Sequence, residues 1–175
     1  MSFLSPRKAG SALRELRPED APALFELIRE EAAAGRLSGG GAELELRDVE
    51  LFILSALLTA GDDYRAVCDG EGRFLGLIGL KDVCPQRAEF RIALTKEARG
   101  RGLARAATEE LLRQAFSRPD APERVFMYTR PDNEETNGFN RALGFRRQEP
   151  EADAPEDIRG LNWYGLTRAE FLRRG

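Results

Sequence analysis

Apolar side chains recur along this chain with two different periods, so strands and helices alternate. Residues 12–17 (ALRELR) alternate apolar and charged side chains, which is typical of a half-buried strand. The next segment has apolar residues at helical spacing, namely Leu24, Leu27 and Ile28. Because Gly35 is suited to the end of a helix, we expect this helix to stop there.

A second helix is predicted over residues 47–60, after a glycine-rich connection, and Gly61 is placed to end it. Its expected buried face consists of Leu51, Leu54, Leu57 and Leu58. Two strands with a DGEG turn between them, at 64–68 and 74–81, then form a predicted hairpin.

The second half of the chain continues the alternation. Predicted strands cover residues 88–95, 124–129, 145–148 and 161–166, and predicted helices cover 102–116 and 134–143. The acidic, proline-containing segment 149–157 is expected to be a solvated loop. Since a hairpin accompanies the alternation, we expect an α+β fold of α/β/α layers with a mixed sheet, in one domain over residues 1–175.

The composition and charge of the chain limit the kinds of partner that it is expected to bind. The chain has 175 residues, 42% hydrophobic and 33% charged, with a net charge of -3. A chain of this length buries roughly two thirds of its unfolded surface, enough for a core without disulfide or metal support. With a pI near 5.3, no nucleic-acid partner is expected. No apolar run is long enough for a signal peptide or a membrane span, so we predict a cytoplasmic protein without a membrane partner.

The absence of histidine excludes several enzyme classes. Ser-His-Asp and Cys-His sites, zinc proteases and two-histidine iron sites all need imidazole as a base or a ligand. Cys68 and Cys84 form no CxxC pair, so we expect reduced thiols and no metal site. Any general base must therefore be a carboxylate, tyrosine, cysteine or lysine.

The segment with the clearest chemical signal lies between the strand at 88–95 and the helix after it. It reads Arg99-Gly100-Arg101-Gly102-Leu103-Ala104. Glycines allow the backbone to approach a ligand, and free N–H groups at a helix start bind phosphate. Nearby cations favour a ligand with several phosphates. The GxxxxGK[ST] motif is absent, and Arg105 stands where GxGxxG needs glycine or alanine.

This segment resembles the [Q/R]xxGx[G/A] loop of the GNAT superfamily of acyl-CoA-dependent N-acyltransferases, with Arg99, Gly102 and Ala104 at the motif positions. The order of the surrounding strands also fits. Asn133-xx-Thr136, followed by Leu143-Gly144-Phe145, looks like that family's later helix. The opening and closing segments are similar to the RimJ/RimL-like branch. The resemblance implies a mostly antiparallel sheet of about seven strands with about four helices.

The resemblance also implies acetyl-CoA as cosubstrate. The pyrophosphate is expected on the backbone N–H groups of residues 100–104. Ile92 and Ala93 are expected to pair with the pantetheine amides, and the thioester carbonyl to meet the N–H of Leu94 at a bulge in the strand. Asn133 is expected both to cap its helix and to contact pantetheine.

For the base, the resemblance points to Glu89, acting through water. The alternative is that Glu89 only pairs with an arginine on a solvated sheet face. Tyr64, Tyr128 and Tyr164 are weaker candidates. Where many relatives have a tyrosine that protonates the departing thiolate, this chain has Asn140, which donates a hydrogen bond but delivers no proton.

Two functions are consistent with these residues. One is an N-acetyltransferase that acetylates a primary amine, either a protein or peptide N-terminus or a small molecule, by direct attack. The other is a non-catalytic acyl-CoA-binding sensor or interaction module. We expect a monomer or a homodimer in either case.

Overall fold

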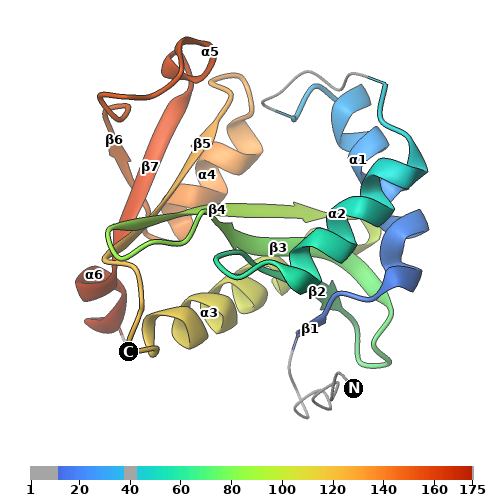
Figure 1. Cartoon of the computed structure of the whole chain (residues 1–175). Coiled ribbons are helices and arrows are strands. Elements are labelled where there is room, and N and C mark those ends of the chain that lie inside the picture. The colour runs from blue at the N-terminus through green and yellow to red at the C-terminus, as the bar shows by residue number, and fades with distance from the viewer. Residues whose placement is uncertain (1–11, 38–42, 175) are drawn as a thin grey trace.

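We describe the chain from a computed structural model that covers residues 12–37 and 43–174. Its centre is a sheet with the strand order β1-β2-β3-β4-β5-β7-β6 (Figure 1). The strands are β1 (Leu13–Glu15), β2 (Asp63–Cys68), β3 (Phe74–Lys81), β4 (Arg87–Leu94), β5 (Arg124–Thr129), β6 (Arg146–Gln148) and β7 (Asn162–Thr167). Every neighbouring pair is antiparallel except β4 and β5. The predicted mixed, mostly antiparallel sheet of seven strands is confirmed.

Helices cover both faces of the sheet. The four longer ones are α1 (Ala21–Ala33), α2 (Leu46–Leu58), α3 (Leu103–Phe116) and α4 (Glu134–Ala142). Two short ones, α5 (Glu156–Arg159) and α6 (Arg168–Leu172), lie near the C-terminal end, and η1 (Pro18–Asp20) and η2 (Lys96–Ala98) are single 3-10 turns. One buried cluster joins α1 and α2 to the sheet, and a larger one joins α3 to the opposite face. No helix in the described ranges is long and apolar enough to span a membrane.

The predicted elements lie within one or two residues of the observed ones, with two differences in the C-terminal part. The segment 149–157, expected to be a solvated loop, contains the start of α5. Its Glu151 forms ion pairs with Arg87, at 3.3 Å, and with Arg124, so part of the loop is attached to the sheet. The helix α6 was not predicted. Its N-cap is Thr167, whose hydroxyl accepts a hydrogen bond from the backbone N–H of Glu170.

The predicted buried face of α2 is wrong. The four leucines at 51, 54, 57 and 58 are exposed, with Leu58 at 84%. The helix instead buries Val49 and Ile53 against α1 and the sheet. Both sets have helical spacing, because α2 is apolar around most of its circumference. Packing on α1 decides which set is covered, and the sequence of α2 does not contain that information.

The parallel pair at the centre of the sheet separates after a short contact. β4 and β5 pair only over Arg87–Glu89 and Arg124–Phe126. Each strand then continues, β4 to Leu94 and β5 to Thr129, and the two diverge (Figure 1). The edge of β4 that faces β5 is therefore without a strand partner from residue 90 onward, which leaves backbone groups for another hydrogen-bonding partner.

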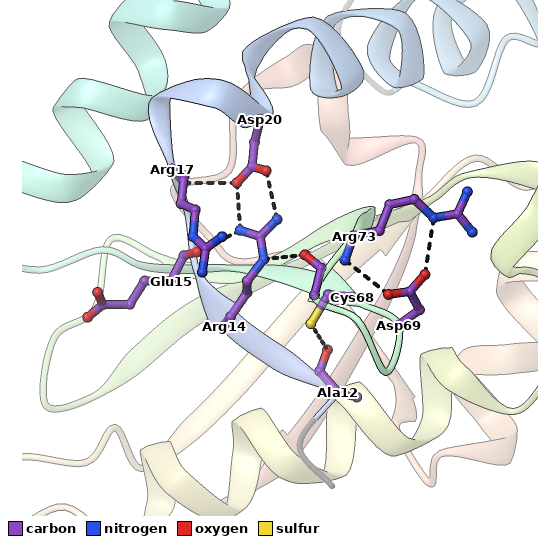
Figure 2. Close-up of polar contacts among 9 residues, drawn as sticks. Ala12, Arg14, Glu15, Arg17, Asp20, Cys68, Asp69 and Arg73 are labelled. Atoms are coloured by element: carbon purple, nitrogen blue, oxygen red, sulfur yellow. Dashed lines mark hydrogen bonds and ion pairs between the residues drawn. The ribbon is translucent and has the colours of Figure 1, made fainter. Parts of the chain in front are cut away.

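A buried ion pair fixes the start of the chain to the sheet (Figure 2). The two terminal nitrogens of Arg14 donate to the two carboxylate oxygens of Asp20, at 2.8 and 2.7 Å. Arg14 Nε also donates to the carbonyl of Gly72, and Asp20 accepts the N–H of Arg17. The two paired side chains are only 6% and 7% exposed. The pair connects β1, η1 and the β2–β3 turn, so its loss affects the position of α1.

Replacing this carboxylate is expected to destabilise the protein strongly. Asp20→Ala leaves the Arg14 guanidinium buried without its counter-ion, at a cost of about 3–5 kcal/mol in the free energy of unfolding. Urea denaturation followed by circular dichroism measures this change. The control is Asp120→Ala, which removes an equally bidentate partner of Arg118 at the surface and should leave the midpoint unchanged. Equal effects of the two substitutions would contradict the role of burial.

Candidate functional site

The register of β3 and β4 determines which backbone groups of β4 are free. The pairing is continuous from Lys81–Glu89 to Gly76–Leu94, so the expected bulge at Leu94 is not present. Thr95 N–H donates to the Leu75 carbonyl at 3.0 Å, and hydrogen-bonded pairs alternate along an antiparallel ladder. The N–H and C=O groups of Ile92 and Leu94 therefore point away from β3, toward the gap beside β5.

Ala93 differs from its two neighbours. By the same alternation its backbone groups point toward β3, and a Cβ at Gly76 would lie 2.5 Å from the Ala93 carbonyl oxygen. The expectation that Ala93 pairs through its backbone with pantetheine is therefore not supported by this register. Its side chain lies on the opposite side of the strand plane from Ile92 and lines the cavity described next.

A cavity of about 520 Å³ occupies the gap where β4 and β5 diverge. Residues from both faces of β4 line it. On the α1 and α2 face its lining includes Ile28, Glu31, Phe52, Tyr64, Glu89 and Arg91. Near β5 and α4 the lining includes Met127, Thr129, Asn133, Thr136 and Asn140. The sequence-predicted residues Glu89, Ile92, Ala93, Asn133 and Asn140 are thus brought together.

The predicted phosphate loop forms the entry to α3. Gly100 and Gly102 have φ values of 72° and 71°, a conformation that side chains with a Cβ rarely adopt. Gly102 is the N-cap, and no side chain caps this end of the helix. The first N–H groups of a helix capped in this way remain available to an anion, with the helix dipole adding positive potential. Arg101 and Lys96 are exposed nearby and form no ion pair with any described residue.

Arg99, the first residue of the loop motif, is directed toward α1 and the end of β4. Its Nη2 contacts the Glu31 carboxylate at 2.5 Å and donates to the Leu94 carbonyl at 3.2 Å. Glu31 also accepts from Arg36, at 2.8 Å. The Arg99 side chain therefore connects α1 to the end of β4. The sequence analysis did not select Glu31. It lies seven positions after Leu24, on the apolar face of the predicted helix, and a charged residue on that face was a signal for a buried ion pair.

Asn140 is fully buried, at 0% exposure. Its Nδ2 donates to Thr129 Oγ1 at 3.3 Å, while its Oδ1 has no partner among the described residues. A buried acceptor without a partner is costly, so this oxygen indicates a ligand group with an N–H or S–H at this point of the cavity. Nearby, Asn133 Oδ1 caps α4 by accepting the Thr136 N–H at 3.2 Å, as expected for the cap.

Another asparagine positions α4. Both the oxygen and the nitrogen of the Asn137 side-chain amide form hydrogen bonds. Its Oδ1 accepts from the Tyr164 hydroxyl at 2.7 Å and from Asn162 Nδ2 at 3.0 Å. Its Nδ2 donates to the carbonyls of Arg130 and Asn133. Sequence reasoning did not select this residue. It fixes α4 to β7, and with α4 the position of Asn140.

Glu89 and Arg91 lie on the face of β4 toward α1. Arg91 Nε donates to Glu89 Oε1 at 2.7 Å, so Glu89 both lines the cavity and has the arginine partner that was considered as its alternative. Burial raises the pKa of Tyr64 to about 12. Burial, followed by the Glu89 carboxylate, raises the pKa of Tyr128. Both phenols are therefore protonated near neutral pH, which leaves Glu89 as the better base.

The residues fit acetyl-CoA. The loop at Gly100 and Gly102 offers backbone N–H groups to a pyrophosphate. The edge of β4 offers the N–H groups of Ile92 and Leu94 and the Ile92 carbonyl to the pantetheine amides, while the Leu94 carbonyl accepts from Arg99. The unpartnered Asn140 oxygen adds an acceptor in the same cavity. No group of three His, Cys, Asp or Glu side chains suited to a metal ion occurs within the described ranges.

Comparisons with known proteins agree with this geometry. Residues 12–146 match the family model of the acetyltransferase (GNAT) domain. Among solved structures, the chain is similar to RimL, a ribosomal L7/L12 alpha-N-protein acetyltransferase in complex with coenzyme A, with a TM-score of 0.73 and 17% identity over 89% of this chain and 92% of that one. It is also similar to spermidine N-acetyltransferase from Vibrio cholerae in complex with CoA and spermine, with a TM-score of 0.76 and 17% identity over 91% and 96%. The chain therefore belongs to the GNAT family and is an acetyl-CoA-dependent N-acetyltransferase.

Proposed function

We propose that this chain acetylates a primary amine whose nitrogen lies beside Glu89 on the α1 and α2 side of the cavity. The observation that carries the proposal is the arrangement around β4. The N–H groups of Ile92 and Leu94 lie on an edge of the strand that has no strand partner, and the Glu89 carboxylate lines the cavity together with Ile92. An amine held there has a carboxylate on one side and the expected thioester position on the other.

In this reaction acetyl-CoA, when bound, supplies the thioester whose C–S bond breaks as the amine nitrogen forms its bond to the acetyl carbon. Glu89 takes the proton that the amine loses, directly or through water. The N–H of Leu94 donates to the carbonyl oxygen and stabilises the charge that develops there. The departing thiolate takes a proton from solvent, since a thiol has a pKa of about 8.5 and Asn140 has no proton to deliver.

Asn140 acts through its free oxygen in this proposal. Since Nδ2 is directed to Thr129, Oδ1 is available to accept from a pantetheine N–H or from the product S–H. This role differs from the donor role that the sequence suggested. It orients the ligand and moves no proton.

The similar structures support the class of acceptor that we propose. We propose that the chain is of the RimJ/RimL-like type, and its similarity to RimL, named as an alpha-N-protein acetyltransferase, supports this. Another is named as a spermidine N-acetyltransferase. Both names specify an amine acceptor, which supports either a protein N-terminus or a small molecule here. We also keep cytoplasmic location and a monomer or homodimer as predictions.

The test is thiol release from acetyl-CoA over a panel of peptide N-termini, amino acids, polyamines and aminoglycosides, with product masses measured. Release is expected only with a matching amine, at one thiol per acetylated product. Acetyl-CoA that stabilises the protein thermally but releases no thiol with any acceptor would support a sensor in place of an enzyme.

A further inference from the structure

Arg91 lines the cavity, but it has no role in the acetyl transfer proposed above. Its Nε donates to Glu89, and its side chain remains 49% exposed. Glu89 is the one described carboxylate with which Arg91 forms an ion pair, and the guanidinium also interacts with the Tyr128 hydroxyl. Because about half of the Arg91 side chain is exposed, its planar guanidinium is still able to bind a further carboxylate through parallel hydrogen bonds.

The two neighbouring strands place an aromatic ring on the same sheet face as Arg91. Gly79 of β3 pairs with Tyr64 on one side and with Arg91 on the other. A Cβ at Gly79 would lie 2.3 Å from Tyr64 Cδ1, so the tyrosine ring lies over the glycine, toward Arg91. The ring forms an apolar wall with Phe52, at a centroid distance of 5.0 Å. Arg91 therefore has Glu89 as its carboxylate partner and the Tyr64 ring on the same face of the sheet.

The remaining charges of the cavity disfavour a polycation. Glu31 is already paired with Arg36 and Arg99, at 2.8 and 2.5 Å. Glu89 is paired with Arg91, so Asp157 is the one lining carboxylate within the described ranges that has no cationic partner. A polyamine would place a second positive charge near the Arg91 guanidinium, where it is repelled. An amine with its own carboxylate complements both members of the Glu89–Arg91 pair.

We propose that the acceptor is an amine that carries a carboxylate close to the reacting nitrogen and an apolar side chain, as an apolar α-amino acid does. Arg91 binds the carboxylate, Glu89 receives the amine proton, and the wall at Ile28 and Phe52 contacts the side chain. This inference rests on the proposed acetyl transfer and specifies its substrate. Two kinds of acceptor have an amine and a carboxylate in this arrangement, namely a free amino acid and a peptide whose N-terminal residue is followed by an acidic residue.

The experiment compares acceptors that differ only in the carboxylate. Leucine, leucinamide and 3-methylbutylamine share the isobutyl side chain and differ at the carboxyl position. Spermidine represents the polycations. Leucyl-aspartyl and leucyl-asparaginyl dipeptide amides separate the peptide source from the free amino acid. The value of kcat/KM for each is measured with the wild type, Arg91→Gln and Arg91→Lys. Arg146→Gln is the control, because it removes another arginine with a single ion pair, at 3.2 Å, on β6.

We expect the ratio of kcat/KM for leucine over 3-methylbutylamine to fall about 30- to 100-fold in Arg91→Gln, the loss expected for a charge-assisted bidentate pair. Arg91→Lys should recover part of it, and Arg146→Gln should not change it. If the peptide is the source, the same ratio change appears between the two dipeptide amides. The ratio cancels any general effect of Arg91 on Glu89, since both acceptors share that effect.

A ratio unchanged by Arg91→Gln, or acetylation of spermidine in preference to every carboxylate-bearing acceptor, would overturn this inference while leaving the acetyl transfer intact. Absence of thiol release with all acceptors would overturn the acetyl transfer itself. Binding of acetyl-CoA, measured by calorimetry in each variant, shows that the cosubstrate site is intact.

Discussion

Gly102→Glu is expected to lower the affinity for acetyl-CoA at least about 100-fold, equivalent to about 2.8 kcal/mol. Two causes add. Gly102 has a φ of 71°, where a residue with a Cβ is strained by about 1–2 kcal/mol. The new carboxylate would also stand at the N-terminus of α3, where a pyrophosphate is expected, and would repel it. Isothermal titration calorimetry with acetyl-CoA measures the effect.

Two further variants separate these causes. Gly102→Ala adds only the backbone strain and should weaken binding less than Gly102→Glu. Gly72→Glu adds the same charge at a turn glycine with a φ of 84° and open space around it, and should bind acetyl-CoA like the wild type. Thermal unfolding without ligand shows whether each variant is folded. Wild-type affinity in a folded Gly102→Glu variant would contradict the assignment of the loop.

Glu89→Gln is expected to lower kcat about 10²- to 10⁴-fold near neutral pH and to leave the affinity for acetyl-CoA unchanged. The substitution keeps the shape of the side chain but removes its capacity to accept a proton. The deficit should shrink as the pH rises, because a larger fraction of the acceptor amine is then already neutral in solution. A pH–rate profile of the variant and the wild type measures this.

The control for this variant is Glu97→Gln, which also removes a carboxylate from an ion pair with an arginine. Glu97 contacts Arg73 at 2.5 Å on the protein surface, outside the cavity. Its profile should match the wild type. If Glu89→Gln and the wild type have the same pH–rate profile, Glu89 is not the base, and it has only the ion pair with Arg91.

Most of the fold could be predicted because local signals agreed with one another. The alternation in residues 88–95 and the four-residue recurrence in residues 102–116 each fit one type of element only. The orientation of α2 could not be predicted, because Leu54 and Ile53 belong to two equally apolar helical faces. The docking of segment 149–157 depends on ion pairs between Glu151 and two arginines far away in sequence, which local pattern does not contain.

Some residues of the site could likewise be predicted from the sequence, and others could not. The glycines at 100 and 102 were found because a helix start with positive φ requires that residue type. The role of Arg99 was not foreseen, since its partner Glu31 lies 68 positions earlier and meets it only in the folded chain. The missing bulge and the free Asn140 oxygen depend on register and side-chain packing. Spacing along the sequence indicates neither.

The most direct test of the central claim is a single-turnover measurement with enzyme in excess over acetyl-CoA, before and after addition of the best amine acceptor. We predict no thiol release before the amine is added. Afterwards, each thiol should be matched by one acetylated acceptor, and the mass of the protein should not change. Stoichiometric binding of acetyl-CoA without thiol release after addition of any amine would contradict the account, and so would an acetyl group retained on the protein.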